Sequence, residues 1–233
     1  MGGARQEGVA GVFERHAARY DLWYESGPGS VLFEAELAAL RLVVEELPGP
    51  ILEIGVGTGR FANALGAEVG VDPARAVLEV LRQRCGATVL PVQADGAQLP
   101  FRDGAFGAAL FVLTLCFTAQ PQQLVREAAR VVRPGGGVVA AIVDRESPWG
   151  AWYLEKKAQG HPFYEHARFL SAGEVAGYLQ EAGLRLERQS CTLLQPPGET
   201  PVPEPPVDSL VPGAGFVCLM ARRPTLMPRR PTR

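Results

Sequence analysis

The sequence predicts an α/β fold around a parallel sheet, and three observations carry that prediction. From residue 51 onward, short apolar segments alternate with amphipathic ones, which is the order of strand and helix in a parallel sheet. The first apolar segment, 51–54, runs into a turn with glycine at residues 55, 57 and 59, and the next segment ends at Asp72. A glycine turn followed by a carboxylate at the next strand end is typical of a sheet that holds a nucleotide-like ligand at its carboxyl edge.

The composition is ordinary for a soluble globular protein. The 233 residues are 47% hydrophobic and 21% charged, with a formal net charge of -2, and a chain of this length can form one domain with a sizeable core. The charge balance disfavours nucleic acid or an anionic membrane as partner. The longest uncharged apolar run, 106–117, is too short to span a bilayer. We therefore expect a small-molecule partner, no nucleic acid and no membrane span; nothing in the sequence indicates an oligomeric state.

The cysteines and the N-terminus favour a reducing cytoplasm. Cys85, Cys116, Cys191 and Cys218 are far apart and form no CxxC pair, which argues against a zinc site or a disulfide framework. Residues 1–11 have no apolar core, so we expect no signal peptide.

Two helices are predicted before the sheet. Residues 9–24 and 31–47 carry apolar side chains at helical spacing, with a break at Gly27-Pro28-Gly29 between them. The segment 20–24, which includes Trp23, crowds three aromatic rings at the end of the first helix. These rings either plug the core or belong to a cover that closes over a cofactor, and both interpretations stay open. The apolar positions are Val9, Phe13, Ala17 and Tyr20 in the first helix and Leu32, Ala35, Ala39, Leu42 and Val43 in the second.

Five strands and three helices are predicted between residues 51 and 144. The segment 105–111 is apolar throughout, as a central parallel strand buried on both faces should be. Pro73 marks the start of a helix. The predicted strands are 51–54, 68–71, 88–93, 105–111 and 138–143, and the predicted helices are 60–65, 74–84 and 121–132.

The chain is less regular after Asp144. Ser171 and Glu174 form a capping box that starts a helix over 171–182. Two strands, 184–194 and 214–221, follow without a helix between them, which predicts an antiparallel pair at the sheet edge. We expect a single domain over 1–223, composed of a helical cover (1–47), a ligand-binding core (48–144), an aromatic-rich roof (145–170) and a C-terminal helix with edge strands (171–223), followed by a disordered tail over 224–233.

The spacing of the glycines leaves two ligand classes open. A dinucleotide fingerprint needs glycine at its first, third and sixth positions, and Gly57, Gly59 and Ala62 give a GxGxxA variant that favours a nicotinamide cofactor. The pattern Glu53-x-Gly55-x-Gly57-x-Gly59 fits better, because a carboxylate inside a buried strand is costly unless it accepts hydrogen bonds from turn amides or faces a cationic ligand.

Three carboxylates, Glu53, Asp72 and Asp95, come at the ends of three successive strands. A carboxylate at the position of Asp72 can accept both hydroxyls of a ribose, and Asp95 is suited to an adenine amino group. Each alone also fits a helix cap, since Asp72 stands directly before Pro73. Together they favour one ligand in one crevice.

Four segments, in chain order, resemble the successive motifs of class I S-adenosylmethionine (SAM)-dependent methyltransferases: ILEIGVGTGRFA, VGVDPA, VQADGAQLPF and LVREAARVVRPGGGVVAAIVD. They are similar to the type 11 branch, which includes the ubiquinone and menaquinone methyltransferases, and the resemblance runs from about Phe13 to Leu184. It implies a doubly wound, Rossmann-like sheet of seven mostly parallel strands with the last strand antiparallel. It also implies SAM as methyl donor and S-adenosylhomocysteine (SAH) as product.

The resemblance also implies where SAM binds. Glu53 and the three glycines would lie at its methionine part, Asp72 at its ribose and Asp95-Gly96 at its adenine, while the segment 20–23 resembles one that folds over the cofactor. The sequence departs from the family at Phe106-Gly107, where Phe-Asp is common; that aspartate is usually structural, so we expect fold and cofactor binding to survive. The implied cofactor-binding set is Glu53, Gly55, Gly57, Gly59, Asp72, Pro73, Asp95, Gly96, Phe111, Val112, Tyr20 and Trp23.

The sequence assigns no catalytic residue. Methyl transfer from a sulfonium is an in-line displacement, for which the protein holds donor and nucleophile in line and excludes water. A base is needed only when the acceptor must first lose a proton. The candidates are His161, His166, Tyr153, Tyr164 and Asp144, each of which is equally explained by packing or exposure.

Several acceptor classes are disfavoured. Residues 111–114 read Phe-Val-Leu-Thr, where the DNA and protein amide-nitrogen methylators resemble one another in an (Asn/Asp)-Pro-Pro-aromatic turn. No cysteine follows a proline, as the cytosine-C5 type requires, and no carboxylate cluster has the spacing of a metal site. We expect methyl transfer to a nitrogen, oxygen or carbon of a small molecule, without a metal. The alternatives are an NAD(P)-dependent oxidoreductase and a cofactor-binding module without catalysis.

Overall fold

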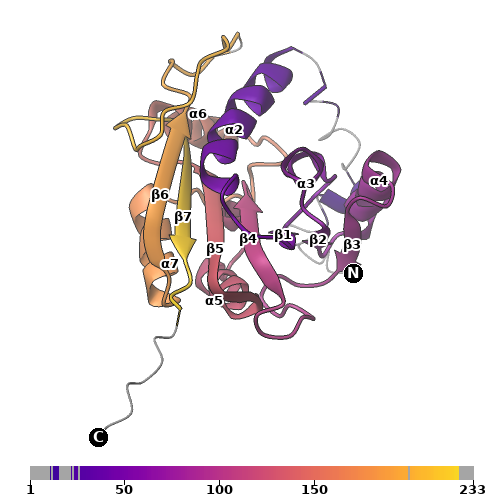
Figure 1. Cartoon of the computed structure of the whole chain (residues 1–233). Helices are drawn as coiled ribbons and strands as arrows, with labels where there is room; N and C mark the ends of the chain where they lie inside the picture. The colour runs from indigo at the N-terminus through magenta and orange to yellow at the C-terminus, as the bar shows by residue number, and fades with distance from the viewer. Residues whose placement is uncertain are drawn as a thin grey trace, which may run out of the picture.

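Seven strands form one sheet in the computed structural model, which describes residues 11, 13–15, 22, 24–25, 27–198 and 200–225. The strand order across the sheet is β3-β2-β1-β4-β5-β7-β6 (Figure 1). The strands are β1 (Ile51–Ile54), β2 (Val69–Asp72), β3 (Leu90–Gln93), β4 (Phe106–Val112), β5 (Val132–Val143), β6 (Arg185–Thr192) and β7 (Phe216–Arg222). The helices are α2 (Pro28–Val44), α3 (Arg60–Leu65), α4 (Arg75–Cys85), α5 (Pro121–Val131), α6 (Pro148–Ala158) and α7 (Ala172–Glu181), with a short 3-10 helix η1 (Leu115–Phe117).

The strand directions confirm the predicted topology. β1 to β5 pair with one another only in parallel, whereas β7 is antiparallel to both β5 and β6. The sheet therefore has seven strands with the last strand of the chain antiparallel. β7 lies between β5 and β6, so the predicted antiparallel pair does form one edge of the sheet.

Helices cover both faces of the sheet. The side chains of β4 alternate between the two faces: Ala109 and Phe111 pack in one core cluster with α5 and α7, and Ala108 and Leu110 pack in another with α2. Figure 1 shows α2 and α3 on the near side of the sheet and α5 and α7 behind it. Every residue of β4 is buried, as predicted for a central strand.

Several predicted boundaries were wrong. α2 begins at Pro28 rather than residue 31, because a proline is accepted in the first turn of a helix. β5 begins at Val132 rather than residue 138, because the stretch from Val132 to Gly137 pairs with β4 through an irregular register. The roof contains a helix, α6, that was not predicted, although Ser147 caps it by accepting a hydrogen bond from the Gly150 N–H.

Neither a membrane-spanning helix nor a metal cluster is present in the described ranges. No helix there has both the length and the apolar character needed to cross a bilayer. No group of three or more His, Cys, Asp or Glu side chains among the same residues is placed to hold a metal ion.

Gly107 accounts for the departure from the Phe-Asp pattern of the family. Its N–H donates to the carbonyl oxygen of Pro50 at 2.8 Å. A Cβ atom at Gly107 would overlap the carbonyl oxygen of Pro48. The segment 48–50 therefore packs so closely on β4 that an aspartate does not fit here, and the sheet forms without one.

Gly107→Ala should lower the free energy of unfolding by about 1–3 kcal/mol, because the added methyl group must displace backbone rather than a flexible side chain. Urea denaturation measures the change. The control is Gly177→Ala in α7, where an added Cβ meets nothing within 4 Å and should stabilise the helix by about 0.5–1 kcal/mol. Equal unfolding free energies for the two variants would contradict the close packing at Gly107.

Candidate functional site

A cavity of about 340 Å³ opens at the carboxyl ends of β1, β2 and β4. This is the edge of the sheet at which the sequence predicts a ligand. Of the predicted binding residues, the cavity wall includes Glu53, Gly55, Gly57, Asp72, Pro73, Asp95, Gly96 and Val112, and it also includes Phe13, Tyr24, Thr58, Arg60, Phe61, Leu113, Thr114 and Phe117.

The three glycines of the turn serve different purposes. All three take positive φ angles, 73° at Gly55, 52° at Gly57 and 78° at Gly59, which favour glycine. A Cβ at Gly57 would meet nothing within 4 Å, so this residue leaves open space in the cavity. A Cβ at Gly59 would come within 2.8 Å of Leu81 on α4, and Gly59 does not line the cavity. Gly57 therefore borders the ligand space, whereas Gly59 allows two helices to approach.

Asp72 links the glycine turn to the end of β2. Its Oδ2 accepts a hydrogen bond from the Gly57 N–H at 3.0 Å, and its Oδ1 accepts one from the Ala74 N–H at 2.9 Å. Burial raises the pKa of Asp72 to about 6, against the lowering effect of these two donors. The N-cap of α4 is Ala74, so Asp72 is not the helix cap that its position before Pro73 also suggested.

Glu53 is a buried carboxyl at the end of β1. Its side chain lines the cavity with only 2% of the residue exposed, and Oε2 has no hydrogen-bond partner among the described residues. Burial, followed by the neighbouring charge of Asp72, raises the pKa of Glu53 well above its ordinary value. A cation in the cavity would offset the free-energy cost of burying the charged Glu53 carboxylate. Of the two interpretations of Glu53 from the sequence, the observed environment fits a carboxyl that faces a cationic ligand. It does not fit one that accepts hydrogen bonds from the turn amides.

The loop after β3 closes another side of the cavity. Asp95 is exposed, and its Oδ1 accepts a hydrogen bond from the Ala97 N–H at 2.8 Å. Gly96 is buried, and a Cβ there would come within 2.9 Å of Ile54. Phe111, another predicted binding residue, is buried in the core on the α5 and α7 side and does not line the cavity.

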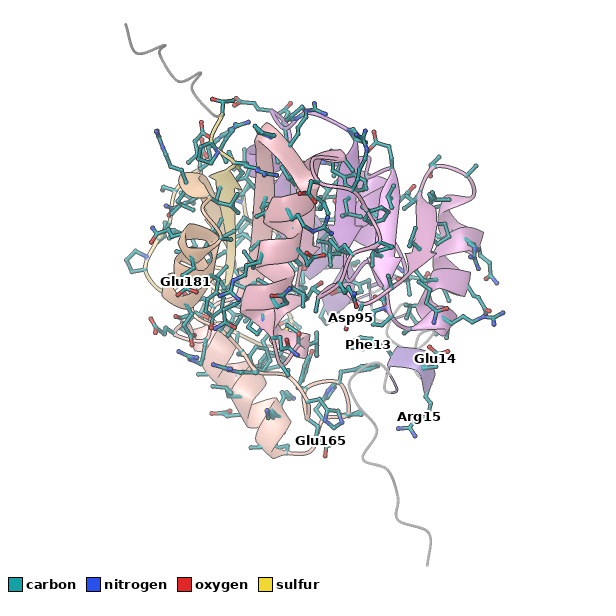
Figure 2. The ribbon with its side chains drawn as sticks, turned by 90° about the horizontal axis from the view of Figure 1, so that it is seen from below. Phe13, Glu14, Arg15, Asp95, Glu165 and Glu181 are labelled. Carbon is teal, nitrogen blue, oxygen red and sulfur yellow. The ribbon has the colours of Figure 1, made fainter. Side chains whose placement is uncertain are left out.

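Part of the N-terminal segment lies against the cavity. Phe13 lines it, with its ring 5.1 Å from that of Phe117. Oε2 of Glu14 accepts a hydrogen bond from the Ala76 N–H at 3.2 Å. Figure 2 shows Phe13 and Glu14 on the side of the molecule where Asp95 lies. Tyr20 and Trp23, predicted to fold over the cofactor, lie outside the described residues.

Tyr24 connects this segment to the glycine turn. The residue is buried and lines the cavity. The guanidinium of Arg60, at the start of α3, lies 5.7 Å from the centre of the Tyr24 ring and 3.3 Å from the Glu25 carboxylate. The end of the predicted cover is therefore held against the same helix that follows the glycines.

A second cavity of about 180 Å³ adjoins the first, because Tyr24, Leu113 and Phe117 line both. Leu113 follows β4 with a φ angle of 54°, which is uncommon for a residue other than glycine and is found at functional sites. The other lining residues are Glu36, Cys116, Ile142, Val143, Tyr153, His161, Phe163, Tyr164, Phe169 and Leu170.

The roof supplies most of the aromatic wall of the second cavity. Of the base candidates, Tyr153, His161 and Tyr164 line it, and the rings of His161 and Tyr164 are stacked with centroids 4.3 Å apart. His166 is exposed and lines neither cavity. Asp144 also lines neither, and its Oδ1 accepts a hydrogen bond from the Glu146 N–H at 3.0 Å.

Glu36 was missed in the sequence, although it lines the second cavity. It is 4% exposed, and Oε2 has no hydrogen-bond partner among the described residues. Burial raises the pKa of Glu36 to about 8. The signal was available: Glu36 occupies the buried stripe of α2 four residues after Leu32, whereas Leu42, predicted for that stripe, is only half-buried.

Two adjoining cavities at the carboxyl edge of a doubly wound α/β sheet define a protein that can hold two small molecules side by side. A type 11 family model described as a methyltransferase domain matches residues 52–140. A solved structure from Thermotoga maritima, described as a SAM-dependent methyltransferase and possible histamine N-methyltransferase, is 32% identical, with a TM-score of 0.80 over 92% of this chain and 99% of that chain. The chain belongs to the class I SAM-dependent methyltransferase family.

The chain is also similar to two curated proteins. An uncharacterized protein of Mycobacterium tuberculosis is 43% identical over 89% of this chain and 72% of its own length. A demethylmenaquinone methyltransferase of Thermus thermophilus is 36% identical over 55% of this chain and 62% of its own length. The resemblance to the SAM-dependent methyltransferases, drawn from four short segments, is confirmed.

The buried Glu36 should make stability depend on pH. Its ordinary pKa is 4.5, and in the folded protein it is about 8. Between these values the unfolded chain has lost a proton that the folded protein keeps, so the folded state loses relative stability as the pH rises through this window. Glu36→Gln should match the wild type near pH 4 and exceed its unfolding free energy by about 3–5 kcal/mol above pH 8.

Denaturant unfolding at several pH values measures this difference. Glu34→Gln is the matched control, because Glu34 lies on the same helix and is exposed. A gap between Glu36→Gln and the wild type that stays constant with pH would contradict the raised pKa.

Proposed function

We propose that this chain transfers the methyl group of SAM to a small-molecule acceptor, with the donor in the cavity beside the glycine turn and the acceptor in the adjoining one. The observation that carries this proposal is the shared wall: Tyr24, Leu113 and Phe117 line both cavities. Two molecules bound in these adjoining cavities would lie next to each other near the shared residues, as an in-line displacement requires.

The residues of the first cavity fit SAM. SAM carries an ammonium group and a sulfonium. The buried carboxyl of Glu53, whose Oε2 has no hydrogen-bond partner among the described residues, could pair with one of these positive charges. Gly57 leaves the space that a ligand needs beside the turn. Asp72 and Asp95 are suited to the ribose hydroxyls and the adenine amino group, as the resemblance implies, and both border the cavity.

Bound SAM would supply a methyl carbon already activated by its sulfonium. The acceptor's lone pair would bond to that carbon, and the carbon–sulfur bond would break with its electron pair left on sulfur to give SAH. The protein has to align the two molecules and exclude water. The apolar walls, Phe13 and Phe117 on the donor side and Tyr153 and Phe169 on the acceptor side, support that role.

A base remains unassigned, and two of the five candidates lose support. His166 and Asp144 border neither cavity. His161, Tyr153 and Tyr164 stay candidates for acceptors that must lose a proton, because they line the second cavity.

We further propose the domain organisation expected from the sequence: one domain over 1–223, with 1–47 as a cover and 145–170 as a roof. The contacts of Phe13 and Tyr24 with the first cavity support the cover, and Tyr153 and Tyr164 in the second cavity support the roof. The free thiols of Cys85, Cys116, Cys191 and Cys218 support a reducing compartment such as the cytoplasm.

Calorimetric titration should give saturable binding of SAM and SAH and none of NADH or NADPH. A methyl-transfer assay by mass spectrometry, with amines, phenols, quinols and thiols as acceptors, then distinguishes an enzyme from a binding module. Binding of a nicotinamide without binding of SAM or SAH would support the oxidoreductase instead. Tight SAH binding with no methyl transfer to any class would favour the module.

Asp72→Ala should weaken SAH binding by about 1.5–3 kcal/mol, because a charge-assisted hydrogen bond to the ligand is lost. Calorimetry at neutral pH measures the change, and circular dichroism checks the fold. Asp208→Ala is the control: Asp208 is exposed and pairs with Arg188 on β6 at 3.2 Å. Unchanged SAH affinity in a folded Asp72→Ala variant would limit Asp72 to holding the turn.

A further inference from the structure

Glu36 is the one acid on the wall of the second cavity, and no Lys or Arg lines that cavity among the described residues. It lies on α2, one of the helices that cover the sheet, and is 4% exposed. Its Oε2 atom has no hydrogen-bond partner in the described part of the chain. Burying a carboxyl without a hydrogen-bond partner costs free energy. The Glu36 carboxyl borders an open cavity rather than the closed core.

The rest of the wall favours a positive charge. Tyr153, Tyr164 and Phe169 form a contiguous aromatic group, with centroids 4.9 Å apart for Tyr153–Tyr164 and 5.9 Å for Tyr153–Phe169. Ring faces attract ammonium groups, most strongly where water is excluded. Aromatic rings together with one carboxylate form the usual surroundings of a bound amine.

The cavity also limits the size of its ligand. Its volume of about 180 Å³ is below the range of about 300–1,000 Å³ typical for drug-sized molecules. The second cavity adjoins the first at Leu113 and Phe117, which line both. The ligand is therefore small and mostly apolar.

We propose that the second cavity binds a small amine whose ammonium group pairs with Glu36 and whose apolar part lies among the roof aromatics. This inference rests on the proposed function in taking the second cavity as the acceptor side. Glu36 is a specificity-determining binding residue in this arrangement.

The pairing restricts which atom is methylated. An ammonium ion has no lone pair, so the nitrogen held by Glu36 cannot be the nucleophile while it is protonated. Glu36 lines only the second cavity, whereas Leu113 and Phe117 line both. The methyl group therefore goes to a different atom of the same molecule, one that reaches the shared wall.

Tyramine and histamine are suitable probes, because each has an ammonium group and a second nucleophile. Their counterparts without the ammonium group are tyrosol and 4-(2-hydroxyethyl)imidazole, in which a hydroxyl replaces the amine. Calorimetry in the presence of saturating SAH should show at least one amine binding ten-fold or more tightly than its alcohol. Glu36→Gln should remove that preference, and Glu34→Gln, on the exposed face of α2, should keep it.

Proton release provides a second readout that a purely structural Glu36 would not give. At pH 7 the carboxyl is mostly protonated, because burial raises the pKa of Glu36 to about 8. Pairing with an ammonium ion therefore releases close to one proton, detected as a binding enthalpy that varies with buffer ionisation heat. Glu36→Gln should abolish this release. The other titratable groups that face the cavity or Glu36 are Tyr24, Cys116, Tyr153, His161, Tyr164 and Cys218.

The outcomes separate this inference from the proposed function. Failure of SAH to bind overturns the proposed function. Tight SAH binding with no amine preferred over its alcohol, or a preference that Glu36→Gln retains, overturns the amine site alone. The comparison of amine with alcohol in the wild-type chain needs no variant, so it decides even if a Glu36 variant fails to fold.

Discussion

The hydrogen bond from the Gly57 N–H to the Asp72 carboxylate fixes the geometry of the first cavity. Glu53 of β1 pairs with Gly70 of β2 in a parallel register, so the turn after one strand and the helix start after the next emerge side by side. One carboxylate joins them, since Asp72 accepts from the Gly57 N–H on one oxygen and from the Ala74 N–H on the other. The cavity wall here is backbone held by hydrogen bonds, which is more rigid than a wall of side chains.

The buried acidic side chains around both cavities carry an electrostatic free-energy cost in the folded protein. Glu53, Asp72 and Glu36 are buried acids, and burial raises the pKa of each; none forms an ion pair with another described residue. A chain selected for stability alone would replace them with apolar side chains. All three line cavities, where a charged or hydroxyl-bearing ligand would offset the cost, rather than the closed core.

The grouping of residues around the first cavity was predictable because it is local in sequence. The turn at Gly55–Gly59 follows β1 directly, and Asp72 and Asp95 follow the next two strands, so strand alternation and parallel pairing suffice to bring them together. Predictions failed where tertiary contacts overrode local signals. The glycine-rich stretch 133–137 joins the sheet because β4 is beside it, and Phe111 turns away from the cavity because strand side chains alternate.

The second cavity could not be predicted in the same way, because it is assembled from distant parts of the chain. Glu36 comes from a helix before the sheet, Leu113 and Phe117 from the loop after β4, and Tyr153 from a helix after β5. No periodicity relates these positions, and a glutamate in an apolar stripe is seen as significant only when a cavity is found beside it. The first cavity is therefore built mainly from the strand ends of the sheet, whereas the second depends on segments that are far apart in the chain.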